Sequence, residues 1–243
     1  EFCRFMKLKV IFFLILFSQT CWANNLTLEI AQAKTNFNYF QKPNLDSNRV
    51  NLPEGNTSTI MRLSGRYQCS EKWLVSFLIA PLSLKYDFIS TSNFTFHSTA
   101  FTSGQATTVR YRFNSYRLGA LRTFEPYKNL TLWLGPILKI RDAKLSVEQA
   151  GLKDSFSNVG PVPLIGFGIK WQIIPRLSIY RYTDALAASQ GSAYDSQLEL
   201  QWAVAQTHQL SFGKRIVGGG VDNEKLKNFA QFDSLYTNYT ISI

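Results

Sequence analysis

Stretches in which apolar and polar residues alternate recur along the chain, and this period of two constrains the fold more than any other feature. In 197–204, Leu198, Leu200 and Trp202 share one face, and the Gln and Glu residues between them share the other. Such alternation is typical of β-strands whose two faces meet different surroundings. No stretch of about 18 apolar residues follows residue 23, so we expect no transmembrane helix there. The pattern predicts an all-β chain.

The breaks between these stretches indicate how the strands are connected. We expect about ten strands, eight to twelve being compatible with the pattern, at 25–40, 57–69, 73–87, 106–124, 129–146, 159–174, 176–187, 194–206, 208–218 and 229–243. Breaks after even-numbered strands are very short. The longer breaks, rich in Asn, Ser, Thr, Gly and Asp, lie near 41–56, 88–105, 147–158, 188–193 and 219–228. Because bacterial outer-membrane barrels alternate short periplasmic turns with long extracellular loops, the sequence predicts a transmembrane antiparallel up-and-down β-barrel with both termini on the periplasmic side.

A soluble periplasmic β-sandwich or a lipocalin-like barrel would also contain alternating strands. In those folds the apolar face is buried and the polar face is solvated. Here the polar face carries long charged side chains mixed with Gly and Ser, whereas the apolar face carries Leu, Trp, Tyr and Phe. This distribution favours an inverted barrel that is apolar outside and polar inside. Prolines within the expected strands, such as Pro81 and Pro136, weaken the prediction because proline removes a donor from the ladder.

The start of the chain has the layout of a cleavable signal peptide. A short basic stretch at 6–9 precedes an apolar run at 10–17, which is too short to span a membrane as a stable helix. Cys21-Trp22-Ala23 resembles a cleavage site. Acylation of Cys21 is a competing interpretation, but the residues before it form a poor lipobox.

We therefore expect 1–23 to be the signal peptide, in which 1–5 can be an over-extended start. Residues 24–243 are expected to form a single barrel domain in the outer membrane.

The net charge of +10 raises the question of a nucleic-acid partner. The 26 Lys and Arg residues are spread along the chain, whereas nucleic-acid binders gather them in a patch or on one helix. We expect no nucleic-acid partner. The expected partners are outer-membrane lipid and lipopolysaccharide, with the barrel-assembly machinery during biogenesis, and we expect a monomer.

No residue pattern indicates a catalytic, metal or cofactor site, so we expect none of the three. His208 and Ser211 stand three apart on a strand and should point to opposite faces, which separates a nucleophile from its base. His97 lies in the longest loop, with no motif joining it to the acidic residues Asp87, Asp184 and Asp195 that could lie at the outer rim.

Two further features lack the pattern of a binding site. Gly218-Gly219-Gly220 lacks the Lys-Ser/Thr of a phosphate loop and is expected to be a flexible loop. Cys69 is the only cysteine after residue 23, so no intramolecular disulfide framework is expected.

If the alternation continues through the barrel, charged side chains line its interior. The predicted inward-facing cluster is Arg62, Arg66, Arg110, Arg112, Lys139, Arg141, Glu199 and Arg215. Glu29 and Asp142 are expected to face it. This excess of positive charge has two interpretations, a salt-bridge network that fills a narrow barrel or a narrow anion-preferring pore.

Three blocks carry a resemblance to a known family. The blocks YRFNSYR at 111–117, KIRDA at 139–143 and SNVGPVPL at 157–164 resemble an uncharacterised family of small Gram-negative outer-membrane β-barrel proteins, and GGGVDN at 218–223 is similar to it as well. The resemblance implies the fold and the location, but no mechanism, because the family has no established activity. The terminal Ile243 departs from the aromatic residue that is commoner there in outer-membrane barrels.

Together these patterns predict a non-enzymatic outer-membrane barrel with a structural or surface-interaction role and long extracellular loops. A narrow anion-preferring pore is the alternative. A lipid-modifying outer-membrane enzyme is a weaker one.

Overall fold

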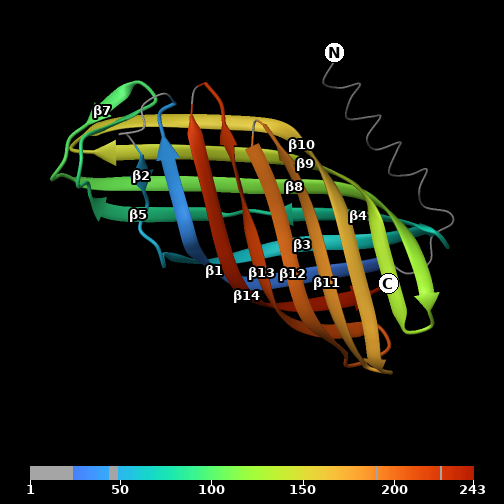
Figure 1. Ribbon diagram of the computed structural model, residues 1–243. Coiled ribbons are helices and arrows are strands. Elements are labelled where there is room, and N and C mark those ends of the chain that lie inside the picture. Colours follow the sequence, from blue (N-terminus) through green and yellow to red (C-terminus); the bar gives the residue numbers. More distant parts are fainter. Residues whose placement is uncertain (1–23, 44–48, 190, 225) are drawn as a thin grey trace, which may run out of the picture.

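The computed structural model describes residues 24–43, 49–189, 191–224 and 226–243, so the predicted signal peptide at 1–23 lies outside the described residues. Within them the chain contains no helix and forms a closed antiparallel barrel (Figure 1). The wall strands are β1 (Asn24–Gln41), β3 (Thr57–Ser70), β4 (Trp73–Ala80), β5 (Ser83–Ile89), β8 (Ala106–Tyr127), β9 (Leu130–Gln149), β10 (Leu152–Ile174), β11 (Leu177–Ala188), β12 (Gly191–Ala203), β13 (His208–Asp222) and β14 (Lys227–Ser242). The short strands β2 (Val50–Asn51), β6 (Phe94–Phe96) and β7 (Thr99–Phe101) lie in the connections. With β4 and β5 counted as one interrupted strand, the predicted ten-stranded barrel is confirmed.

Pairing of the first and last strands closes the barrel. β1 pairs with β14 from Asn25↔Ser242 to Gln41↔Lys227, with one irregularity between Thr35 and Phe37. All other neighbours in the wall are also neighbours in sequence, which is the up-and-down order. The third predicted strand is interrupted at Pro81, and both of its halves pair with β8. This interruption is the effect expected of a proline, which cannot donate to the ladder.

Three of the expected long loops are shortened by strands that run into them, and those predictions were wrong. The loop expected at 188–193 is one, since β11 ends at Ala188 and β12 begins at Gly191. β9 and β10 continue through most of 147–158 and meet at a two-residue turn, where Ala150 has φ 48° and Gly151 has φ 83°. Two positive φ angles are what a type I′ hairpin turn requires, but Ala in the first position gives no sequence signal for it. The expected loop at 219–228 is also shortened, because β13 runs through the three glycines to Asp222.

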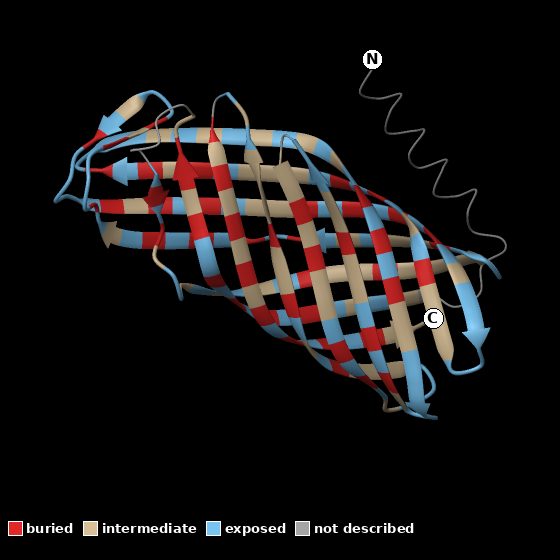
Figure 2. Ribbon diagram, in the orientation of Figure 1, coloured by how far each residue is buried: buried red, intermediate tan, exposed pale blue. Residues whose placement is uncertain are grey.

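The outside of the barrel carries a broad apolar band. Leu118 is 57% exposed and Ile165 is 58% exposed, and both point away from the interior. Exposed and buried residues alternate along the wall strands in Figure 2. The band also includes Leu26, Leu28, Ile30, Phe77, Ile79, Leu134, Leu138, Phe167, Leu198, Leu200, Trp202, Phe212 and Leu235. An apolar surface of this extent matches the lipid-facing surface of a transmembrane barrel.

No helix in the described part of the chain is long and apolar enough to cross a membrane.

Toward the long-loop end, the polarity of the two faces of the wall is reversed. In the middle of β8, Arg117 is buried inside and Leu118 is exposed outside, whereas near its outer end Tyr111 is buried inside and Arg112 is exposed outside. In β9 the buried inward residue is Lys139 at mid-barrel and Leu145 further out. The same alternate positions face inward along the whole of each strand. What changes is the type of residue at those positions, from charged at mid-barrel to apolar further out. We infer that the reversal marks the level at which lipid gives way to water.

Candidate functional site

A network of ion pairs crosses the middle of the barrel interior. Asp195 of β12 is 2% exposed and lies 2.7 Å from the Arg62 guanidinium and 2.8 Å from that of Arg215. A third guanidinium, from Arg117, lies 2.9 Å from Asp195 and 2.5 Å from Asp184. Glu29 of β1 completes the network, 2.5 Å from Arg215. Three arginines and three carboxylates thus compensate one another at mid-barrel.

The structure places six of the eight predicted interior residues inside the barrel. Arg62, Lys139, Glu199 and Arg215 are buried, while Arg66 and Arg141 are partly exposed on the same inward face. Glu199 accepts hydrogen bonds from Tyr236 Oη at 2.9 Å, Asn238 Nδ2 at 2.8 Å and Gln201 Nε2 at 2.6 Å.

The prediction was wrong for Arg110 and Arg112, whose side chains are exposed on the outside of the barrel. Asp142 also lies outside, where its carboxylate is 2.9 Å from Arg112. The alternation in this part of β8 was read correctly, but its direction was reversed. These residues lie beyond the apolar band, on the stretch of the strand whose outer face is polar.

Three interior residues were missed. The sequence did not point to Arg117, and it allowed Asp184 and Asp195 to lie at the outer rim, whereas all three are buried at mid-barrel. Asp184 and Asp195 are direct partners in the β11–β12 ladder, so their carboxylates share one face. Because like charges opposite one another destabilise a sheet, such a pair needs a cation between them. Arg117 contacts both, and only the register of strands distant in sequence reveals this.

Between this network and the short-turn end lies a cavity of about 510 Å³. Its wall includes Glu71 and Lys128 at the turns, so it reaches that end of the barrel. Arg66 lies inside it with its guanidinium 4.6 Å from the centre of the Tyr180 ring and 5.3 Å from that of Trp133. The cavity is therefore a polar vestibule that stops at the ion pairs.

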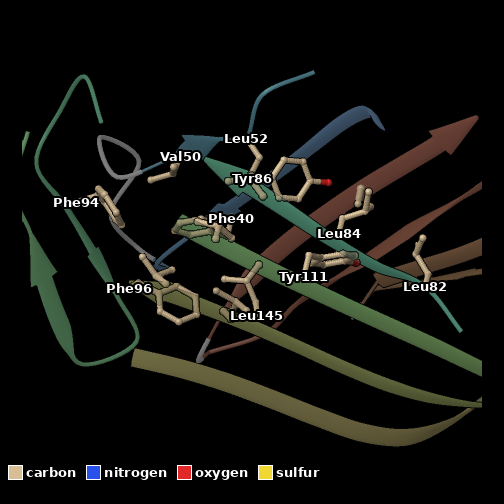
Figure 3. Packing of buried hydrophobic residues seen from close by; sticks show 14 of the residues in the cluster. Phe40, Val50, Leu52, Leu82, Leu84, Tyr86, Phe94, Phe96, Tyr111 and Leu145 are labelled. Atoms are coloured by element: carbon tan, nitrogen blue, oxygen red, sulfur yellow. The ribbon is translucent and has the colours of Figure 1, made fainter. Parts of the chain in front are cut away.

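Apolar side chains fill the barrel interior on the other side of the network (Figure 3). We call this cluster the apolar plug; it includes Phe40, Val50, Leu52, Leu82, Leu84, Tyr86, Phe94, Phe96, Phe101, Val109, Tyr111, Leu145, Val147, Leu226, Ala230 and Phe232. Its rings interlock, with Phe40 and Phe96 edge to face at 5.2 Å between centroids. Phe94, Phe96 and Phe101 come from the hairpin β6–β7 at the long-loop end, and we call the connection between β5 and β8, residues 90–105, the mouth-covering segment. The plug therefore closes the long-loop end of the barrel.

The tip of the β9–β10 hairpin holds the mouth-covering segment in place. Asp154 accepts hydrogen bonds from the backbone amides of Ser98 at 3.0 Å and Thr99 at 3.1 Å. Gln149 does the same for the amide of Thr102 at 2.9 Å and donates to the carbonyl oxygen of Thr102 at 2.9 Å. We call Asp154 and its contacts with the β6–β7 turn the Asp154 clamp.

The three acidic residues that could have lain at the outer rim with His97 do not gather around it. His97 Nδ1 lies 3.4 Å from Asp154, whereas Asp184 is the ladder partner of Gly166 on the same strand β10. Twelve residues separate 154 from 166, which is roughly 40 Å along a strand. Asp195 lies beside Asp184, and Asp87 is exposed on the outer face. The Ser98 hydroxyl next to His97 donates to Asp154 at 3.2 Å, so the carboxylate beside His97 binds the hydroxyl as well.

The second histidine lies at the short-turn end. The His208 ring stacks on Tyr239, with a 2.8 Å hydrogen bond between His208 Nδ1 and Tyr239 Oη, whereas Ser211 is fully buried inside. His208 and Ser211 thus lie on opposite faces, as strand alternation requires. Among the described residues, no group of His, Cys, Asp and Glu has an arrangement that could hold a metal ion.

Solved structures similar to this chain are Gram-negative outer-membrane β-barrel proteins. Neisserial surface protein A is 14% identical, with a TM-score of 0.38 and coverage of 90% of this chain and 98% of that chain. Ail, the attachment invasion locus protein of Yersinia pestis, is 12% identical, with a TM-score of 0.39 and coverage of 90% and 99%. The outer-membrane protease OmpT of Escherichia coli is 9% identical, with a TM-score of 0.45 and coverage of 92% and 99%. Identities and TM-scores this low assign neither a family nor a function.

No protein-family model matches the sequence, and no curated protein matches it.

Replacing Asp195 by Asn should destabilise the barrel strongly, because three buried guanidinium groups lose a shared carboxylate. Breaking a buried pair costs about 3–5 kcal/mol of unfolding free energy. Asp87→Asn is the matched control, since Asp87 is 59% exposed and pairs with Lys85 on the outer face, where a pair contributes up to about 1 kcal/mol. Urea unfolding of the refolded protein in lipid vesicles measures both. Equal losses in the two variants would show that the network does not hold the interior together.

The Asp154 clamp should loosen in acid. Burial raises the pKa of the Asp154 carboxyl. Hydrogen bonds from Ser98, Ser155 and Thr99 lower that pKa by more than burial raises it, so the folded pKa lies below the ordinary value. A depressed folded pKa adds stability above the unfolded pKa, and this stability is lost as pH falls through the folded pKa. We expect the hydrogen-exchange protection of the Ser98 and Thr99 amides to fall below about pH 4.

In an Asp154→Ala variant the same protection should be absent at neutral pH. The amide of Gly104, which donates to the carbonyl of Ser90 at 2.7 Å, is the internal control because Asp154 does not contact it. Protection that is unchanged in the variant would rule out the clamp.

Proposed function

We propose that this protein is an outer-membrane barrel closed to solutes, with a structural or interaction role at the cell surface. The observation that carries the proposal is the double closure of the interior. Ion pairs cross the barrel at mid-height, and the apolar plug fills it beyond them. An ion would have to separate paired charges and then cross an apolar segment, and both steps oppose conduction.

The architecture of the outer end supports a role at the surface. β8, β9 and β10 are 22, 20 and 23 residues long, well beyond the 9–11 residues or so that cross a bilayer. Figure 1 shows their outer ends, with β5 and β7, projecting past the tips of β14 and β13. The outer part of the chain therefore consists of extended strands, to which Asp154 and Gln149 attach the mouth-covering segment, rather than of long irregular loops.

The pore alternative loses part of its support once the residues are placed. It relied on a basic interior, but Arg110 and Arg112 lie outside, and three carboxylates neutralise Arg62, Arg117 and Arg215, so that Arg66, Lys139 and Arg141 carry the remaining positive charge. The lipid-modifying enzyme remains the weaker alternative. Asp154 lies 3.4 Å from His97, but the neighbouring Ser98 hydroxyl donates to that same carboxylate at 3.2 Å, and His208 bonds to Tyr239.

Closure predicts that the refolded protein carries no stepwise ionic current in a planar bilayer. A known porin inserted under the same conditions is the positive control, and a heat-dependent shift in gel mobility verifies that the protein is folded. Stepwise anion-selective current from folded protein would overturn the proposal in favour of the pore.

Surface exposure predicts a difference in labelling between the two ends. In a Cys69→Ser background, a Ser103→Cys variant should react with a membrane-impermeant maleimide on intact cells, because Ser103 is exposed in the mouth-covering segment. A Lys128→Cys variant, at an exposed short turn, should react only after the outer membrane is permeabilised. The reverse pattern, or equal labelling of both, would contradict the proposed location and orientation.

A further inference from the structure

Four basic side chains gather on the outside of the barrel at the level where its polarity reverses. They are Lys85 of β5, Arg110 and Arg112 of β8, and Lys144 of β9, and all four are exposed. Lys85 is the direct partner of Arg110 in the β5–β8 ladder, and Arg112 is the direct partner of Lys144 in the β8–β9 ladder. We call these four residues the basic patch.

The patch holds more positive charge than its neighbours neutralise. Like charges directly opposite one another destabilise an antiparallel pair, and the patch contains two such pairs side by side. Asp87 lies 2.7 Å from Lys85, and Asp142 lies 2.9 Å from Arg112. In the described part of the chain, Arg110 and Lys144 have no carboxylate within salt-bridge distance. An external anion at this position would relieve the repulsion.

The position of the patch indicates where that anion comes from. The outward residues just below are Asn114 and Asp142, and the next row down, Tyr116 and Ile140, already belongs to the apolar band. Arg112 lies four residues above Tyr116, roughly 13 Å along the strand and about 10 Å in height once strand tilt is included. Long basic side chains can cover that distance by extending toward the membrane surface. The patch therefore lies at the height of lipid head groups.

A shallow hollow at the patch fits a phosphate group. It has a volume of about 280 Å³, and Arg110, Arg112 and Lys144 line it together with the hydroxyl-bearing residues Ser83, Thr108 and Ser146. Guanidinium groups form strong charge-assisted hydrogen bonds to phosphate oxygens, and hydroxyl groups can donate to the oxygens that remain. Glu148 and its ladder partner Lys153 also line it.

We propose that the basic patch binds the phosphate group of lipopolysaccharide in the outer leaflet, with the acyl chains lying along the apolar band. The continuity between a basic hollow and a lipid-facing surface favours an anionic lipid over a soluble anion. The proposal rests on the outer-membrane location proposed above, but it is independent of whether the barrel conducts.

The test compares lipid A that carries both phosphates with dephosphorylated lipid A and with inorganic phosphate. Binding to the refolded protein in detergent micelles is measured by native mass spectrometry. Phosphorylated lipid A should bind, and an R110Q/K144Q double variant should bind it roughly 10–100-fold more weakly, because two charge-assisted contacts are lost. Lys214→Gln is the matched control, since Lys214 also points outward, from β13, but lies 3.5 Å from Asp233. It should bind like the unaltered protein.

Each other outcome overturns the proposal. Equal affinity of the double variant and the unaltered protein would exclude the patch as the site. Equal binding of dephosphorylated lipid A would mean that the acyl chains alone are recognised. If millimolar inorganic phosphate displaced bound lipid A as effectively as unlabelled lipid A does, the hollow would be a site for a free anion. A heat-dependent mobility shift verifies that each variant is folded, and because the assay uses purified protein, its failure is distinct from a failure of the labelling or conductance experiments.

Discussion

The hydrogen bonds between β1 and β14 are the interaction on which the rest of the structure depends. Lipid offers no partner for a backbone N–H or C=O group, so a sheet can cross a membrane only if it has no free edge. The β1–β14 ladder, from Asn25↔Ser242 to Gln41↔Lys227, removes the last edge of this sheet. Closure then creates an interior that must be filled. The ion-pair network and the apolar plug are the two ways in which it is filled.

The interior is filled by paired charges at mid-barrel and by apolar side chains toward the long-loop end. At mid-barrel the inward face carries charged residues, and removing them from water is costly unless each is paired. Asp195, shared among Arg62, Arg117 and Arg215, supplies that pairing. Beyond the network, Phe40 and Phe96 belong to an apolar core like that of a soluble protein. The barrel is thus a membrane protein at its centre and resembles a soluble β-barrel at its outer end.

The same reversal organises the outer surface. Where the interior becomes apolar, the exterior becomes polar, so the exposed Leu118 and Tyr116 are followed by Arg112 and Arg110 along one strand. The boundary places basic side chains next to lipid-facing ones, which is the arrangement that an anionic lipid would recognise. The closed interior and the basic patch are therefore two consequences of strands that continue past the membrane.

The sequence by itself determined the strand class, the number of strands, the up-and-down order and the alternation within each strand, because these depend on local patterns and on turn residues near in sequence. Three features were decided only by the tertiary structure. Whether Arg112 points to water or into the interior depends on where the strand leaves the lipid, and the alternation is the same in both cases. The shared role of Asp195 depends on β3, β8 and β13 converging on it, and these strands are distant in sequence. The Ala150-Gly151 turn formed because the long, continuous ladder of β9 with β10, from Leu152↔Gln149 to Trp171↔Leu130, outweighed a turn sequence that carries little local preference.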